Sequence, residues 1–327
     1  MTISGILKGK EWLLMIFLII VVFSAMIAPS SLSFQGISAM SVYGVEIGIV
    51  AFGEMLVIMS GGGGIDLSVG SMFALSQVIL GIVVAHGFPL ALAVFVSLLS
   101  GALMGFLNGV VITKLRIPAI IVTLATMYAY AGIALVLTKG IDISPFPASF
   151  NFIGQGMILD IPFQLIAIYV PVALLLYIFL QRTDYGWNLK LVGSNALAAQ
   201  YSGISLNKVR LVAYVGAGLL SAIAGIIDAS RLVTARPDAG STANLAAITI
   251  AVLGGTKLQG GEGSIGGTIL ATLAITWLGY AFGLANINAV YEEGAVGIVL
   301  LLTIAAQEQP ILLKVFEYIH SGDSSHA

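Results

Sequence analysis

Long apolar runs constrain what this chain can fold into more than any other feature of its sequence. Each run is roughly 15–24 residues long and carries few charges, which is the length that an α-helix needs to cross a bilayer. Lipid cannot hydrogen-bond peptide groups, so membrane-spanning segments are helices or closed β-barrels. Barrel strands would alternate polar and apolar residues over about ten positions, and these runs do not alternate. We therefore predict an all-α, polytopic membrane protein.

We interpret the runs as about ten transmembrane helices in a single transmembrane domain that covers residues 1–327. The predicted spans lie at about 12–28, 40–59, 68–86, 89–112, 118–138, 164–181, 209–228, 244–256, 265–284 and 293–306. The first run resembles a signal peptide, with Lys8 and Lys10 before it. It is long for such a segment and lacks a clear cleavage site, so we expect a retained helix.

Composition excludes several classes of protein. Apolar residues make up 59% of the 327 residues and charged residues only 9%, whereas a soluble domain carries about 25% charged residues. A soluble enzyme, a nucleic-acid binder and a disordered chain are therefore excluded. The net charge of −2 gives no sign of polyanion binding. The chain has no Cys, which excludes disulfides, Cys-zinc sites and thiol nucleophiles.

Basic residues predict the orientation, because cytoplasmic loops carry an excess of Lys and Arg. With the N-terminus inside, ten of the 13 Lys and Arg residues fall in cytoplasmic segments and three fall outside. The ten are Lys8, Lys10, Lys114, Arg116, Arg182, Lys190, Lys208, Arg210, Lys257 and Lys314, and the three are Lys139, Arg231 and Arg236. An even number of spans then places both termini in the cytoplasm.

The cytoplasmic connection at about 182–208 contains a predicted short helix. Ser194 or Asn195 is suited to cap its start, Ala198 and Ala199 favour helix, and Gly203 is suited to end it in a left-handed conformation. An isolated helix of this length is unstable in water, so we expect a partner surface to hold it. Residues 320–327 are predicted to form a short disordered tail.

Two glycine-rich segments match at a constant offset of 196 residues. Residues 61–71 (GGGGIDLSVGS) align with 257–267 (KLQGGEGSIGG), so that Asp66 corresponds to Glu262 and Ser68 to Ser264. Both segments precede a predicted span on the cytoplasmic side, which predicts a parallel internal repeat with glycine-broken helices. Exposed backbone at such breaks is tolerated only inside protein or beside a water-filled cavity. Elsewhere, glycines four residues apart, at 101, 105 and 109, predict close helix packing.

Ionisable residues inside spans are costly and therefore indicate function. Glu46 and Glu54 lie in the second span and Asp228 ends the seventh. Acids also cap helix starts, which is the competing interpretation for Asp66, Glu292 and Glu293. The residues that we predict for a solute path or its gating are Glu54, Gly63, Gly64, Asp66, Ser68, Gly260, Glu262 and Ser264.

Motifs for catalysis and cofactors are absent from the sequence. Residues 261–266 spell G-x-G-x-x-G, but membrane helices flank them instead of the βαβ unit that a dinucleotide site needs. There is no Walker phosphate loop, no HExxH and no G-x-S-x-G. We predict a non-catalytic chain with no metal and no cofactor of its own.

Several segments, taken in order, identify the chain as a member of a family. Residues 63–71 (GGIDLSVGS) resemble the signature of the ribose-type sugar permeases of bacterial ABC importers. Residues 117–124 (IPAIIVTL), 253–256 (LGGT) and 260–263 (GGEG) resemble further segments of these permeases, and 193–204 (GSNALAAQYSGI) is similar to their ATPase-coupling segment. The coupling residues that match are Gly193, Asn195, Ala198, Ala199, Ser202, Gly203 and Ile204. One departure is that four glycines, at 61–64, stand where the family has two.

The resemblance implies an importer permease in a bacterial inner membrane. Two permease subunits, identical or homologous, would form the path, and two cytoplasmic ATPase subunits would bind ATP and Mg²⁺. A periplasmic or lipid-anchored binding protein would deliver a sugar or sugar-like solute. The alternatives are an ion-coupled carrier using Glu46, Glu54 and Asp228, an ABC permease for branched-chain amino acids or nucleosides, and an intramembrane enzyme, for which the sequence lacks catalytic groups.

Overall fold

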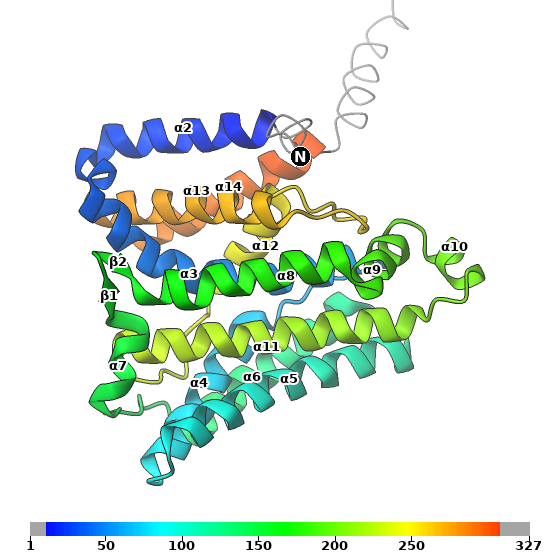
Figure 1. Cartoon of the computed structure of the whole chain (residues 1–327), viewed down its shortest axis with the longest axis horizontal. Helices are drawn as coiled ribbons and strands as arrows, with labels where there is room; N and C mark the ends of the chain where they lie inside the picture. Colours follow the sequence, from blue (N-terminus) through cyan, green and yellow to red (C-terminus); the bar gives the residue numbers. More distant parts are fainter. Residues whose placement is uncertain (1–10, 145, 308–327) are drawn as a thin grey trace, which may run out of the picture.

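The predicted spans all coincide with helices in the structure, a computed structural model that describes residues 11–144 and 146–307 (Figure 1). The elements in chain order are α2 (Glu11–Ile27), η1 (Pro29–Leu32), α3 (Phe34–Met59), α4 (Val69–Ala85), α5 (Leu90–Leu115), α6 (Ala119–Thr138), α7 (Ala148–Gln155), β1 (Met157–Ile158), β2 (Ile161–Pro162), the π-helical turn η2 (Leu165–Tyr169), α8 (Val170–Arg182), α9 (Asp184–Ser194), α10 (Ala196–Tyr201), α11 (Leu206–Leu232), α12 (Ala243–Leu253), α13 (Ile265–Leu284) and α14 (Ala289–Gln307). The predicted tail at 320–327 and Lys8, Lys10 and Lys314 lie outside the described residues.

Seven helical segments in the described part of the chain are long and apolar enough to cross a membrane. Three further apolar helices are shorter: Leu13–Ile27, Val69–Ala85 and Ala243–Leu253. The shortest, α12, has 11 residues and therefore extends only about 16 Å along its axis, half of a bilayer core. The all-helical, polytopic prediction is thus confirmed, while the count of ten spans and the location of the termini remain predictions.

Helices α3 and α11 form the centre of the bundle, and both are largely buried. Around them, α5, α6, α8 and α14 expose most of their apolar side chains, as helices that face lipid do. Small residues bring the backbones together: a Cβ at Gly101 would overlap the Gly218 carbonyl oxygen, and one at Gly105 would overlap that of Tyr214. The close packing predicted for the glycines at 101 and 105 is therefore confirmed.

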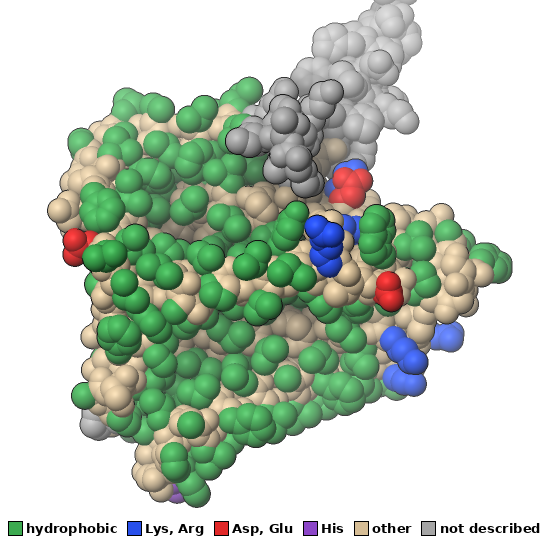
Figure 2. Space-filling model, in the orientation of Figure 1, with side chains coloured by type: hydrophobic (Ala, Val, Ile, Leu, Met, Phe, Trp, Pro, Cys, Tyr) green, Lys and Arg blue, Asp and Glu red, His purple; other side chains and the backbone are tan. Residues whose placement is uncertain are grey.

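The two ends of the bundle differ in chemistry. We call the end that carries α9 and α10 the α10 end, and the opposite end, where α7 and the β1–β2 hairpin lie, the α7 end (Figure 1). Figure 2 shows Lys and Arg side chains gathered at the α10 end, while the rest of that face is mostly apolar. At the α7 end, α7 is fixed to the last turn of α11, because Gly154 N donates to Ser230 Oγ at 2.8 Å.

The packing of helices α3–α6 resembles that of α11–α14, a similarity that the aligned glycine-rich segments did not predict. Helix α4 packs on α11, α5 and α6, and α12 packs in the same way on α3, α13 and α14. Helices α3 and α11 run in opposite directions, since Arg231 near the end of α11 meets Glu46 in the middle of α3, while Arg210 near the start of α11 meets Ser60 just beyond the end of α3. The packing thus relates α3–α6 to α11–α14 in an inverted sense. The parallel repeat remains a prediction from sequence alone.

Candidate functional site

Three segments that the sequence marked separately meet at the α10 end, at Gly61, Gly193, Gly260 and Gly261, which we call the glycine junction. Gly261 N donates to the Met59 carbonyl oxygen at 3.0 Å, at the end of α3. A Cβ at Gly193 would overlap that same oxygen and Gly261 N, and one at Gly260 would lie 2.5 Å from Gly61 Cα. Three backbones therefore cross at a separation that leaves no room for a side chain.

Backbone conformation gives a second reason for glycine here. Gly61, Gly260 and Gly261 have φ values of 69°, 95° and 81°, a region that L-residues with a side chain rarely adopt. The two chain breaks and the start of the predicted coupling segment thus form one contact. The sequence identified each piece, but only the fold brings them together.

Helix α10 is built as its sequence predicts, with Asn195 as its N-cap. Asn195 Oδ1 accepts from Ala198 N at 2.9 Å, and Gly203, with φ 79°, follows the helix end, where Ile204 N donates to the Ala199 carbonyl oxygen at 3.0 Å. Ala199 is buried. Leu197 and Tyr201, four residues apart, are 68% and 90% exposed on one side of the helix. Tyrosine is among the residues that most often dominate binding at protein interfaces, so this side of α10 is suited to dock a partner.

Helix α9 fixes α10 to the bundle. Tyr185 Oη donates to the Val209 carbonyl oxygen in α11 at 2.8 Å, and its ring stacks on Phe179 of α8. Burial raises the pKa of the Tyr185 hydroxyl, so the group remains a donor at any physiological pH. A force on α10 therefore acts on a braced segment that leads directly into Gly193.

The first glycine break encloses a buried polar group of Glu54, Asp66, Ser68, Asn108 and Tyr130, which we call the Asp66 cluster. Asp66 Oδ1 accepts from Ser68 N at 2.8 Å and from Ser68 Oγ at 2.5 Å, while Asn108 Nδ2 donates to Ser68 Oγ at 2.8 Å. Asp66 N donates to Glu54 Oε1 at 3.1 Å, and Tyr130 Oη to Asn108 Oδ1 at 3.2 Å. Glu54 Oε2 has no hydrogen-bond partner among the described residues. The cluster thus ties α3, α5 and α6 to the break.

Replacing Asn108 by alanine tests this cluster. The substitution removes a donor from Ser68 and an acceptor from Tyr130 inside the bundle, which we expect to lower stability by about 1–3 kcal/mol. The measurement is the thermal transition of the purified protein in detergent. Asn207→Ala is the matched control, because Asn207 is exposed in the first turn of α11, and its transition should not move. Equal transitions for both variants would contradict a structural role for the cluster.

The second glycine break differs from the first. Ser264 caps α13, since its Oγ accepts from Gly267 N at 3.1 Å. Glu262, which aligns with Asp66, is 64% exposed and pairs with Lys257 at 2.6 Å, and such surface pairs stabilise little. Gly64 packs beside the Val57 carbonyl oxygen at the other break. The aligned acids therefore have opposite surroundings.

A buried charge cluster of Glu46, Asp228 and Arg231 joins α3 and α11 near the α7 end; we call it the Arg231 cluster. Arg231 Nε donates to Glu46 Oε1 at 2.7 Å, its Nη2 donates to Asp228 Oδ1 at 2.6 Å, and its guanidinium lies 4.9 Å from the centre of the Tyr43 ring. Gln77 of α4 donates to Asp228 Oδ2 at 3.3 Å. Both acids were predicted to be functional from the sequence, whereas Arg231 was predicted only to lie on the outer side, with no partner.

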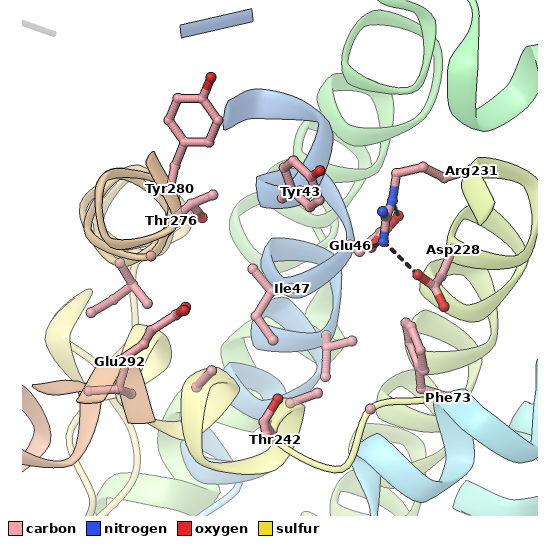
Figure 3. Close-up of a pocket in the computed structure, with 18 of the residues that line it drawn as sticks. Tyr43, Glu46, Ile47, Phe73, Asp228, Arg231, Thr242, Thr276, Tyr280 and Glu292 are labelled. Atoms are coloured by element: carbon pink, nitrogen blue, oxygen red, sulfur yellow. Dashed lines mark hydrogen bonds and ion pairs between the residues drawn. The ribbon is translucent and has the colours of Figure 1, made fainter. Parts of the chain in front are cut away.

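A cavity of about 580 Å³ opens beside the Arg231 cluster, between α3, α11, α13, α14 and residues 236–243 (Figure 3). Figure 3 shows Glu46, Arg231 and Asp228 on one side, Glu292, Thr276 and Tyr280 on the other, and Tyr43 between the two. A cavity of this volume fits a small-molecule ligand, and its polar lining lies within an otherwise apolar bundle.

The predicted path residues do not line this cavity. Its lining includes none of Glu54, Gly63, Gly64, Asp66, Ser68, Gly260, Glu262 and Ser264. Sequence reasoning marked its acids Glu46, Asp228 and Glu292 but missed Tyr43, Arg236, Thr242, Thr276 and Tyr280. Single hydroxyls in apolar helices carry no local signal. The one available indication was a basic residue, Arg236, in the irregular segment 233–242 between two apolar helices.

Comparisons with known proteins agree on a family. The chain matches the family described as branched-chain amino acid transport system, permease component, over residues 36–304. It is 38% identical to the ribose import permease protein RbsC of Bacillus subtilis, over 79% of this chain and 80% of that protein, and 36% identical to RbsC of Haemophilus influenzae, over 92% and 93%. It is 35% identical to the autoinducer 2 import system permease protein LsrD of Salmonella typhimurium, over 80% of each. No solved structure matches the chain.

Proposed function

The chain belongs to the ribose-type family of importer permeases, so it is a multi-pass bacterial inner-membrane transport subunit, and from that premise we propose how it works. It is the permease of an ATP-binding-cassette importer and moves its solute inward by alternating access. ATP and Mg²⁺ bind to partner ATPase subunits, and this chain has no catalytic role. A second permease subunit, identical or homologous, completes the path, and a periplasmic or lipid-anchored binding protein delivers the solute.

The solute is a sugar or sugar-like molecule. The family description refers to amino-acid systems. The relatives that this chain matches over four-fifths or more of their length are named for ribose and autoinducer 2. The low charge of the membrane helices supports a neutral solute, because charged groups in a bilayer are costly.

The α10 end faces the cytoplasm in this proposal. The excess of Lys and Arg at that end supports the orientation through the positive-inside rule. The ten apolar helices cross the membrane, with the short α12 completed by the irregular residues 233–242 that precede it, and both termini are cytoplasmic. Irregular backbone at membrane depth is tolerated where it is buried or lines a cavity, and residues 236–243 include lining residues of the cavity.

The glycine junction is the observation that carries the coupling mechanism. Helix α10 presents Leu197 and Tyr201 to an ATPase subunit, and Gly193, three residues before α10, contacts the end of α3 and the loop before α13 without intervening side chains. A displacement of α10 therefore reaches both helices directly. Because the middle of α3 and the second half of α13 both line the cavity, the displacement changes the shape of the path.

Uptake into vesicles tests the proposed function. Vesicles that contain this chain with its ATPase and binding protein should accumulate D-ribose or a related sugar only with ATP, and an inactivated ATPase should abolish uptake. Uptake that follows a Na⁺ or proton gradient without ATP would instead establish the ion-coupled carrier. Uptake of leucine in place of any sugar would establish an amino-acid permease.

Tyr201→Ala should lower ATP-driven uptake by tenfold or more. Tyr201 is 90% exposed, so its loss should leave the fold intact, whereas loss of an aromatic anchor from an interface costs about 2 kcal/mol or more. The measurement combines uptake with capture of the ATPase by the purified permease. The matched control is Tyr177→Ala, at an exposed position of α8 inside the membrane. If Tyr201→Ala transports and binds ATPase like the wild type, α10 is not the coupling helix.

A further inference from the structure

We propose that the cavity beside the Arg231 cluster is a solute-binding site contained within this single chain, and that Arg236 and Glu292 hydrogen-bond a neutral, hydroxyl-rich solute there. This inference rests on the proposed function and extends it, because it assigns a binding site and its recognition groups. The site faces the outer side in the proposed orientation, since its lining residues Asp228 and Arg231 lie at the end of α11 that Ser230 joins to α7.

The backbone of Arg236 is held in position, and its side chain makes no hydrogen bond to a described residue. Its backbone N donates to Gln77 Oε1 at 3.2 Å, and Gln77 is itself fixed by Asp228. The side chain lines the cavity, and its Nε is buried without a hydrogen-bond partner among the described residues. A guanidinium group offers five donors, and a buried donor without a partner is destabilising. The two terminal nitrogens of the guanidinium, which no described residue accepts from, are the groups that a hydrogen-bond-accepting ligand in the cavity would reach.

Glu292 supplies the complementary acceptor from another wall. It is half-buried in the first turn of α14 and lines the cavity, and no described residue donates a hydrogen bond to it. Gly279 makes room for it, because a Cβ there would overlap Glu292 Oε1. A carboxylate accepts hydrogen bonds from hydroxyl groups, and the absence of a side chain at position 279 keeps it free to do so.

The charges of the lining select the class of solute. Arg231 is occupied by Glu46 and Asp228, so Arg236 and Glu292 are the charged lining groups left for a ligand. Three acids against two arginines give the lining a net charge of −1, which disfavours an anion. A molecule with several hydroxyl groups can donate a hydrogen bond to Glu292 and accept one from Arg236 at the same time. Tyr280 and Thr242 also line the cavity and add hydroxyl groups to it.

Thiol labelling tests the site, because the chain has no Cys and each introduced thiol reports alone. Thr242→Cys and Thr276→Cys place thiols on the cavity wall. Thr249→Cys is the matched control, since Thr249 is fully buried in α12 and is not part of the lining. In right-side-out vesicles of the assembled importer without ATP, a membrane-impermeant cationic methanethiosulfonate should label the two cavity variants and leave the control unlabelled.

Protection from labelling then tests recognition. D-ribose, D-xylose, D-glucose and ribitol are tested one at a time, with L-leucine as the non-hydroxylated comparison. At least one of the four polyols should slow labelling severalfold and leucine should not. Adding Arg236→Gln or Glu292→Gln to Thr242→Cys should remove the protection while labelling without solute stays fast.

Three results would overturn the site: cavity thiols as unreactive as Thr249→Cys, protection by none of the polyols, or protection unchanged by both second substitutions. These results are separable from a failure of the proposed function, because labelling needs no ATP. An importer with ATP-driven uptake but no protection retains its function and loses this site. If polyols protect the cavity thiols but uptake does not need ATP, this site is retained and the proposed function is lost.

Discussion

Gly193→Ala is expected to reduce ATP-driven uptake by at least tenfold while the chain still inserts into the membrane. A Cβ at this position would overlap the Met59 carbonyl oxygen and Gly261 N, so the three backbones of the glycine junction must separate. Close-packed contacts transmit a displacement, whereas a loosened contact absorbs it. Uptake and ATPase activity should therefore become uncoupled: ATP hydrolysis continues and transport falls.

Gly266→Ala is the matched control for this experiment. Gly266 lies in the first turn of α13, a few residues from the junction, and a Cβ there would meet nothing within 4 Å. We expect its uptake to equal that of the wild type. Gly261→Ala, which strains the same junction through a positive φ of 81°, should resemble Gly193→Ala. Normal uptake in both junction variants would show that the coupling force takes another route.

Arg231→Gln is expected to cause the largest loss of stability. Its guanidinium side chain is only 16% exposed and pairs with both Glu46 and Asp228. Removing one partner leaves buried carboxylates uncompensated, which costs about 3–5 kcal/mol at a fully buried site and somewhat less at this exposure. The thermal transition in detergent should fall by several degrees. Arg182→Gln, at an exposed position at the end of α8, should leave the transition unchanged.

A double substitution separates the charge effect from packing. Glu46→Gln combined with Arg231→Gln removes one uncompensated carboxylate and leaves two neutral amides of similar size. We expect this pair to recover part of the stability lost in Arg231→Gln, as coupled neighbours do in a double-mutant cycle. Additive losses in the two single variants would mean that Glu46 and Arg231 do not stabilise each other.

Local features of the chain were predictable because they depend on neighbours in sequence. Asn195 caps α10 and Gly203 follows its end, as the sequence indicates, since both effects act within one helical turn. The alignment of Asp66 with Glu262 suggested equivalent positions, but the two acids lie in different environments although both occur in glycine-rich segments. Asp66 is buried against Ser68 and Asn108, while Glu262 pairs with Lys257 at the surface.

The sequence by itself determined that this chain is a bundle of membrane helices and roughly where each apolar helix lies. Apolar runs must satisfy their own backbone hydrogen bonds in lipid, so length and hydropathy suffice. Tertiary structure alone decided which groups meet. Glu46 and Arg231 lie 185 residues apart, the junction glycines come from three separate segments, and a hydroxyl such as that of Thr242 gains meaning only when helix packing leaves a cavity in front of it.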